Sequence, residues 1–118
     1  SDIYFDYHRN MKFADAVQTL LALGQETRLT VFRLIVQKGD TGVYPSRIAE
    51  ELGIPPATLS FHLKELHRAQ LVSVERQSRK LLYRPRADSV DELMEFLLFN
   101  CCGGKGCAPK RTNKSRSK

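Results

Sequence analysis

The sequence contains no tryptophan, only two methionines, and no cysteine outside residues 101–107. It also lacks any apolar run near the roughly 18–20 residues that cross a membrane as a helix. The longest such run, Leu93 to Phe99, is interrupted by Glu95, and no secretory leader is recognisable at the start of the chain. The 118 residues, 42% of them apolar, therefore predict one folded, soluble domain in the cytoplasm, with no membrane among its partners.

Positive charge is unevenly distributed along the chain. The formal net charge is +6, and the segment 103–118 contains basic residues but no acidic one. In the rest of the chain, residues 28–86 hold 11 basic against 5 acidic side chains, whereas the flanking segments 1–27 and 88–95 are acidic. A basic middle between acidic flanks favours one face for a polyanion such as nucleic acid.

Apolar periodicity predicts five helices and one hairpin. Helices are expected at 11–23, 26–38, 45–52, 57–69 and 89 to about 100–102, and strands at 71–77 and 80–86. Gly39 is expected to cap the second helix, and Ser89 with Glu92 forms a capping box that opens the last one. This order predicts a mainly α fold with a small β-hairpin, a winged helix-turn-helix over residues 11–102. An N-terminal arm, 1–10, and a basic tail rich in glycine and lysine, 103–118, flank this domain.

Each helix has apolar residues at helical spacing, and those of the third, fourth and last helices are expected to face inward. The expected faces are Phe13, Val17, Leu20 and Leu21; Leu29, Phe32, Ile35 and Val36; Ile48, Ala49 and Leu52; Leu59, Leu63 and Leu66; and Val90, Leu93, Met94, Leu97 and Leu98.

The fourth helix and the hairpin carry the candidate DNA contacts. Phe61 lies opposite the apolar face of that helix, where an exposed ring finds a partner in a thymine methyl group of the major groove. His62 lies on the flank, where a DNA contact and a satisfied residue at the edge of the core remain two open alternatives. The basic turn of the hairpin suits the phosphate backbone. The candidate DNA-binding residues are Ser46, Arg47, Thr58, Ser60, Phe61, His62, Lys64, Arg68, Arg76, Arg79 and Lys80.

Three segments resemble the ArsR/SmtB family of metalloregulatory repressors. They are Thr27-Arg28-Leu29, Ser60-Phe61-His62-Leu63-Lys64-Glu65-Leu66 and Tyr83-Arg84, within a similarity that spans about residues 14–99. The resemblance implies a homodimer that binds two-fold double-stranded operator DNA, with the first and last helices forming the dimer interface. The residues implied for dimerisation are Phe13, Val17, Leu20, Leu21, Val90, Leu93, Met94 and Leu97.

The three cysteines, Cys101, Cys102 and Cys107, are close in sequence, which in a reducing cytosol favours a soft-metal or redox site over a disulfide framework. The Cys-x-Cys arsenic site of one family subtype is absent, since Tyr44 and Ser46 occupy those positions, and the last helix lacks the histidines of the zinc-sensing subtype. Three thiolates match the three pyramidal ligands of trivalent arsenic, and the position resembles that of C-terminal cysteine triads in arsenite-sensing members. The sequence thus predicts a repressor of an arsenic-resistance operon that leaves its operator when As(III), or Sb(III), binds these thiolates. No permanent cofactor is expected.

Other functions remain open. A thiol redox or persulfide sensor on the same fold would use the same cysteines, and an interaction module that does not bind DNA would use only the basic surface. An enzyme is disfavoured, because the three histidines show no spacing typical of metal ligands or catalytic bases and no phosphate loop is present.

Overall fold

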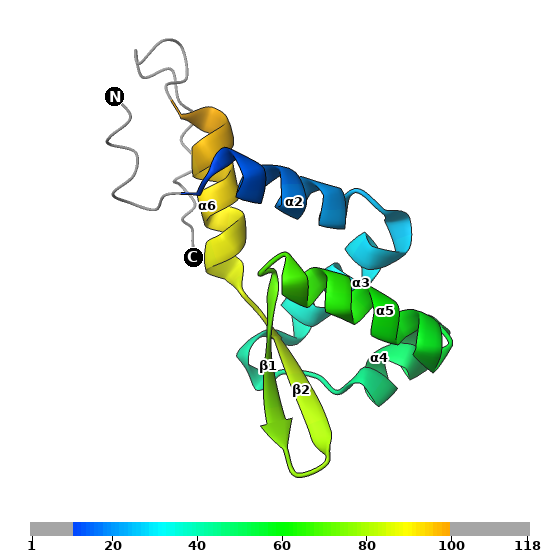
Figure 1. The fold of residues 1–118 in the computed structure, drawn as a ribbon. Coiled ribbons are helices and arrows are strands. Elements are labelled where there is room, and N and C mark those ends of the chain that lie inside the picture. Colours follow the sequence, from blue (N-terminus) through cyan, green and yellow to red (C-terminus); the bar gives the residue numbers. More distant parts are fainter. Residues whose placement is uncertain (1–10, 100–118) are drawn as a thin grey trace.

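The computed structural model describes residues 11–99, which form five α-helices, one 3₁₀ turn and a two-stranded antiparallel hairpin (Figure 1). In chain order the elements are α2 (Phe13–Leu23), α3 (Glu26–Lys38), η1 (Gly39–Thr41), α4 (Pro45–Leu52), α5 (Pro56–Arg68), β1 (Val72–Gln77), β2 (Lys80–Pro85) and α6 (Ala87–Leu98). The predicted order and the winged helix-turn-helix architecture are confirmed, and the helix and strand bounds lie close to those expected, except at the two ends of the last helix.

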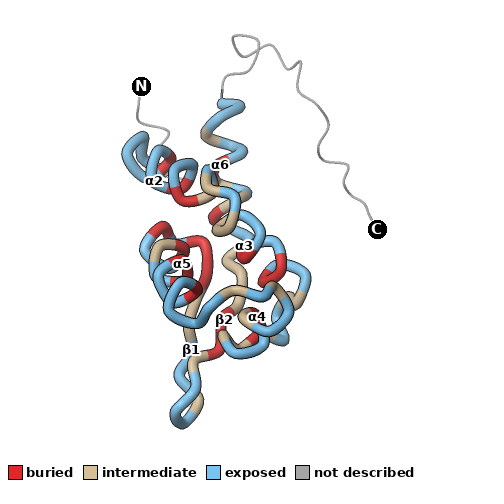
Figure 2. Tube along the Cα trace, turned by 90° about the vertical axis from the view of Figure 1, so that its right-hand side faces the viewer, coloured by how far each residue is buried: buried red, intermediate tan, exposed pale blue. Residues whose placement is uncertain are grey.

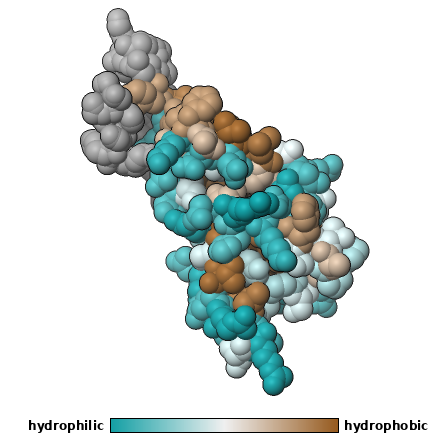
Figure 3. Space-filling view, in the orientation of Figure 1, coloured by the Kyte–Doolittle hydropathy of each residue, from teal (hydrophilic) through white to brown (hydrophobic). Residues whose placement is uncertain are grey.

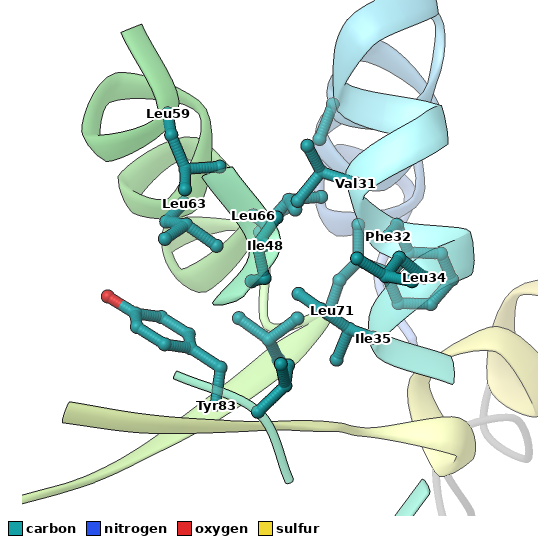
Figure 4. Packing of buried hydrophobic residues seen from close by; sticks show 14 residues of the cluster. Val31, Phe32, Leu34, Ile35, Ile48, Leu59, Leu63, Leu66, Leu71 and Tyr83 are labelled. Carbon is teal, nitrogen blue, oxygen red and sulfur yellow. The ribbon is translucent and has the colours of Figure 1, made fainter. Parts of the chain in front are cut away.

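The core lies between α3 and α5. Val31 and Ile35 of α3 meet Leu59, Leu63 and Leu66 of α5, and these five side chains are at most 2% exposed (Figure 4). Ile48 of α4, Leu71 and Tyr83 close the cluster from the remaining sides. The predicted inward faces of α4 and α5 are therefore confirmed. Most buried residues lie in the helices, and the tip of the hairpin is exposed (Figure 2).

The predicted face of α3 is only half right. Phe32 and Ile35 are buried as expected, but Leu29 and Val36 are 42% and 49% exposed, and Val31 and Leu34 occupy the core in their place. The helix is covered on more than one side, because it contacts α2, α4, α5 and β2. A single apolar stripe therefore does not describe it.

The loop after α3 adds a strand-like residue to the hairpin. Gly42 has a φ of +83°, and a Cβ there would lie only 2.7 Å from Cγ of Leu82, so this position requires glycine. Val43 then exchanges two backbone hydrogen bonds of 2.9 Å with Tyr83 of β2. This bridge, which the sequence analysis did not predict, ties the hairpin to the segment that leads into α4.

The capping box predicted at Ser89 is wrong. Helix α6 begins at Ala87, so Ser89 lies inside it, is 5% exposed, and donates its hydroxyl hydrogen bond to the carbonyl of Gln70 at 2.5 Å. The neighbouring Arg86 also reaches Gln70: its guanidinium donates to the Gln70 side-chain oxygen, and its backbone N–H donates to the carbonyl of Leu71 at 2.9 Å. The start of α6 is thus fixed to the end of α5 by three hydrogen bonds rather than by a cap of its own.

The last helix is also shorter than expected. Its last residue is Leu98, and Phe99 has extended backbone angles, φ −57° and ψ 133°. The predicted helical end at 100–102 is therefore wrong. The cysteines themselves lie outside the described residues.

Helices α2 and α6 cross, with the rings of Phe13 and Phe96 edge-to-face at 5.8 Å between their centroids (Figure 1). The predicted apolar face of α2 is turned outward: Phe13, Val17, Leu20 and Leu21 are all at least 40% exposed, whereas Ala16, Thr19 and Ala22 are buried. On α6, Met94 and Leu97 are exposed, but Leu93 is 5% exposed and belongs to the core of the protomer, which corrects its place in the predicted dimer set. Hydrophobic surface accordingly covers the region of α2 and the upper part of α6 (Figure 3). Within residues 11–99, no helix is both long enough and apolar enough to cross a membrane.

Candidate nucleic-acid interface

Helices α4 and α5 form the helix-turn-helix. The turn between them uses Gly53 in the left-handed region, φ +66° and ψ +36°, and Pro56 opens α5, where its missing N–H costs nothing. Burial of Leu59, Leu63 and Leu66 leaves the opposite side of α5 facing solvent. The predicted contacts on that exposed side are Thr58, Ser60, Phe61, Lys64 and Arg68.

Phe61 is the most informative of these side chains. It is 56% exposed although it is a large aromatic residue, and its ring lies edge-to-face on His62 at 5.3 Å. Solvent exposure of such a ring brings no stability to the free protein. In the major groove, by contrast, an apolar ring gains contact with a thymine methyl group.

His62 does not lie on this exposed side. Its side chain is 7% exposed, and its Nδ1 is 3.3 Å from a terminal nitrogen of Arg28. Arginine has no acceptor, so Nδ1 must accept this hydrogen bond, and the imidazole proton is then on Nε2. Burial, followed by the charge of Arg28, holds the pKa of His62 below its usual value. Of the two alternatives for His62, the structure favours a hydrogen-bonded residue at the edge of the core over a DNA contact.

Arg28 is a residue whose role the sequence analysis missed. Besides His62 of α5, its Nε donates to the carbonyl of Ala22 in the last turn of α2 at 2.7 Å. Its backbone N–H donates to the side chain of Gln25, which caps α3. Arg28 therefore joins α2, α3 and α5 at one point, and its place in the Thr27-Arg28-Leu29 segment was the only available signal.

The predicted basic contacts fall into two groups. Arg47 pairs with Glu51 at 2.6 Å, and Arg68 pairs with Glu65 on the same helix. Lys64, Arg76 and Arg79 are exposed and pair with no carboxylate among residues 11–99. These three cations need break no ion pair with a described residue before they meet a phosphate. Ser46, also predicted, is exposed in the first turn of α4.

The hairpin forms the wing and extends beyond the helices (Figures 1 and 3). Its register pairs Gln77 with Lys80, and Ser78 in the turn between them has a φ of +60°. Lys80 differs from the other basic residues of the wing, because its ammonium lies 5.0 Å from the ring centroid of Tyr44. Arg76 and Arg79 have no such contact within the described chain.

The base of the wing is held by a second pair of charges. Arg84 donates to Glu75 across the hairpin at 2.6 Å and to the backbone carbonyl of Asp40 in η1 at 2.8 Å. The hydrogen bond from Arg84, and after it one from Gln77, lowers the pKa of Glu75. Both groups are largely solvated, so this pair orients the strands more than it stabilises the fold.

The described residues contain no group of three or more histidine, cysteine, aspartate or glutamate side chains that could hold a metal ion. The four acidic residues of α6, which share a helix, therefore form no such site. Cys101, Cys102 and Cys107, the predicted ligands, lie outside residues 11–99, so their prediction stays untested.

Comparison with known proteins agrees with this geometry. Residues 23–75, which span α3 to β1, match a family model described as a helix-turn-helix domain. An uncharacterised helix-turn-helix-type transcriptional regulator of Methanocaldococcus jannaschii is 29% identical over 86 residues, which cover 73% of this chain and 94% of that protein.

Two solved structures share the fold. An ArsR-like transcriptional regulator from Rhodococcus sp. RHA1 matches with a TM-score of 0.66 at 20% identity, over 88% of this chain and 97% of that one. A homodimeric winged helix-turn-helix DNA-binding domain from Mycobacterium bovis, a possible ArsR-family regulator, matches with a TM-score of 0.59 at 23% identity, over 80% and 83%. The chain is therefore a winged helix-turn-helix protein with the fold of the ArsR-like regulators.

Proposed function

We propose that this protein is a transcriptional regulator that binds double-stranded DNA as a homodimer. The observation that carries this proposal is the division of α5: Leu59, Leu63 and Leu66 are buried, while the opposite side presents Thr58 and Phe61 to solvent. A helix of this kind enters the major groove, where a hydroxyl and an apolar ring read base edges. The similarity to a helix-turn-helix-type transcriptional regulator supports the same function.

The unpaired cations supply the sequence-independent part of the binding. Lys64 lies on α5, and Arg76 and Arg79 lie on the wing, so each protomer offers positive charge from two elements. Contacts with phosphates position a protein on the duplex, and contacts with base edges select the sequence. The wing would therefore add affinity, and α5 would add specificity.

The homodimer is proposed from the exposed apolar surface of α2 and α6. Val17, Leu20, Met94 and Leu97 are between 40% and 50% exposed, and Leu21 is 68% exposed. Apolar side chains gathered on two neighbouring helices mark an interface with another molecule. A second copy is the proposed occupant, because one of the proteins of similar fold is homodimeric. Two α5 helices related by a two-fold axis would read half-sites about 34–36 Å apart.

The proposed signal is trivalent arsenic, or antimony, bound by Cys101, Cys102 and Cys107. The support is chemical: three soft thiolates in a short segment match the ligand number of As(III), and the described part of the chain offers no competing metal site. Because α6 ends at Leu98, the binding segment would act on the end of the apolar surface formed by Leu97 and Leu98 rather than through a continuous helix. Capture of the metalloid would favour a dimer unsuited to the operator, and DNA would in turn weaken metalloid binding.

Fluorescence anisotropy on the DNA upstream of the protein's own gene tests both levels of this proposal. The wild-type protein is expected to bind with a sequence preference and to dissociate on addition of arsenite, but not of zinc. A variant with all three cysteines replaced by serine should bind DNA equally well and stay bound in arsenite. Absence of sequence-specific binding would refute the regulator, and release of the triple variant by arsenite would refute the site.

Peroxide added in the same assay examines the remaining alternative. A thiol redox sensor would dissociate in peroxide and lose two hydrogens for each disulfide formed, and a persulfide sensor would dissociate only in an added polysulfide and gain the mass of each sulfur atom taken up. A metalloid sensor would instead gain one arsenic atom and lose three protons for each arsenic bound. Intact-protein mass spectrometry after each treatment separates these outcomes.

A further inference from the structure

Tyr44 contacts both residues of the last pair in the hairpin. It is the residue immediately before α4, and its hydroxyl donates a hydrogen bond to Oε1 of Gln77 at 2.5 Å. Its ring lies under the ammonium of Lys80, 5.0 Å from the centroid, and Gln77 and Lys80 are opposite one another in the register. One side chain of the helix-turn-helix thus holds the two residues that flank the turn of the wing.

The contact continues into a short network. The amide oxygen of Gln77 accepts from Tyr44, and Gln77, after the larger effect of Arg84, helps to lower the pKa of Glu75. Glu75 accepts from Arg84, and Arg84 donates to the backbone carbonyl of Asp40. In addition to the backbone bridge between Val43 and Tyr83, side-chain hydrogen bonds therefore fix the wing at η1 and at the residue preceding α4.

A two-stranded hairpin needs contacts of this kind if it is to keep a fixed orientation relative to the helices. Two strands alone are marginally stable in water, and the register here comprises only six residue pairs. If the tip of the wing were mobile in the free protein, the entropy lost when DNA orders it would weaken binding. A tip that is already held toward α4 would avoid this loss.

We propose that Tyr44 is a positioning residue that directs Arg76 and Arg79 of the wing toward the phosphate backbone of DNA. Lys80 is a structural part of this contact, held on the tyrosine ring, rather than a member of the phosphate-binding set. The inference rests on the proposed DNA-binding function and adds to it the residue that couples the helix-turn-helix to the wing.

The test compares Tyr44→Phe, which removes the hydroxyl but keeps the ring, in two backgrounds: wild type and Arg76→Ala/Arg79→Ala. In the wild-type background, DNA binding is expected to weaken about three- to tenfold for each wing, the effect of one lost hydrogen bond. In the second background, the same substitution should change binding by less than about twofold, because no wing arginine remains to be directed. Gln77→Ala should reproduce Tyr44→Phe and add little to it, and Gln37→Ala, an exposed glutamine on α3, is the matched control.

Melting temperatures and backbone heteronuclear NOE values complete the test. Tyr44→Phe should lower the NOE at Ser78, Arg79 and Lys80 and leave the values of α5 unchanged. An equal loss of binding in both backgrounds, or no loss in either, would overturn the positioning role. If the wild-type protein shows no DNA binding at all, the proposed function fails and the positioning role fails with it, a result distinct from normal wild-type binding that Tyr44→Phe does not change.

Discussion

Replacement of Arg79 by alanine should weaken the salt dependence of DNA binding by an amount that follows from the number of exposed cations at the candidate interface. Each protomer presents three exposed cations at the candidate interface that contact neither a described carboxylate nor, as Lys80 does, an aromatic ring: Lys64, Arg76 and Arg79. A dimer would then make about six phosphate contacts through them. Each contact contributes about −0.9 to the slope of log Kobs against log salt, so a slope of about −5 is expected for the wild type. Arg79→Ala removes one contact from each protomer and should reduce the magnitude of the slope by about 2.

The measurement is a series of anisotropy titrations between about 50 and 300 mM salt, the range in which counterion release dominates. Arg33→Ala is the matched control, because Arg33 is an exposed cation of α3 that has no described ion pair and lies outside the candidate interface. It removes the same charge and should leave the slope nearly unchanged. Equal slopes for Arg79→Ala and Arg33→Ala would show that net charge, and not the wing, determines binding, and the reasoning would be refuted.

Three further substitutions test the core, the buried histidine and the outer apolar surface. Leu66→Ala, at a side chain with no exposure, should cost about 2–5 kcal/mol of unfolding free energy in urea denaturation, and a cost below about 1 kcal/mol would contradict the described packing. The lowered pKa of His62 means that the unfolded chain binds protons more readily than the folded one, so stability should fall as the pH drops below about 6.5. His62→Gln should show a smaller fall in urea midpoint between pH 7.5 and 5.5, and an equal fall would assign the effect to other groups. Leu97→Glu places a charge on a half-exposed apolar position and should yield a folded monomer by light scattering, with a melting temperature lowered by the lost stabilisation of the dimer; a dimer would exclude α6 from the interface.

The helices and strands were predictable because the spacing of their apolar residues and the helix-ending residues beside them indicate the same bounds. Gly39 illustrates this: it follows the last residue of α3, has a φ of +64°, and donates its N–H to the carbonyls of Ile35 and Val36, as a C-terminal cap does. The choice of face in α3 failed for a different reason. Leu29 and Val31 are equally apolar in sequence, and only the neighbours of the helix decide which of them is buried.

The candidate site was predictable where it depends on one helix and not where it depends on contacts between elements. Phe61 was correctly placed on the exposed side from the period of α5 alone. Nothing in the spacing of the sequence connects Arg28 with His62, or Tyr44 with Gln77, because 34 and 33 residues separate these partners. Ser89 shows the opposite error, since a local capping pattern was present but the hydroxyl satisfies the carbonyl of Gln70 instead.

Gln70 has a further consequence. It follows α5 by two residues, has a φ of +64° although it is not glycine, and accepts hydrogen bonds from both Arg86 and Ser89 at the start of α6. The start of α6 and the segment that follows α5 are therefore joined through one common residue. A tilt of α6 that preserves these hydrogen bonds must drag the C-terminal end of α5 with it, and one that breaks them leaves a buried hydroxyl and a backbone carbonyl without their partners. A displacement of the start of α6 is in this way coupled to the end of α5.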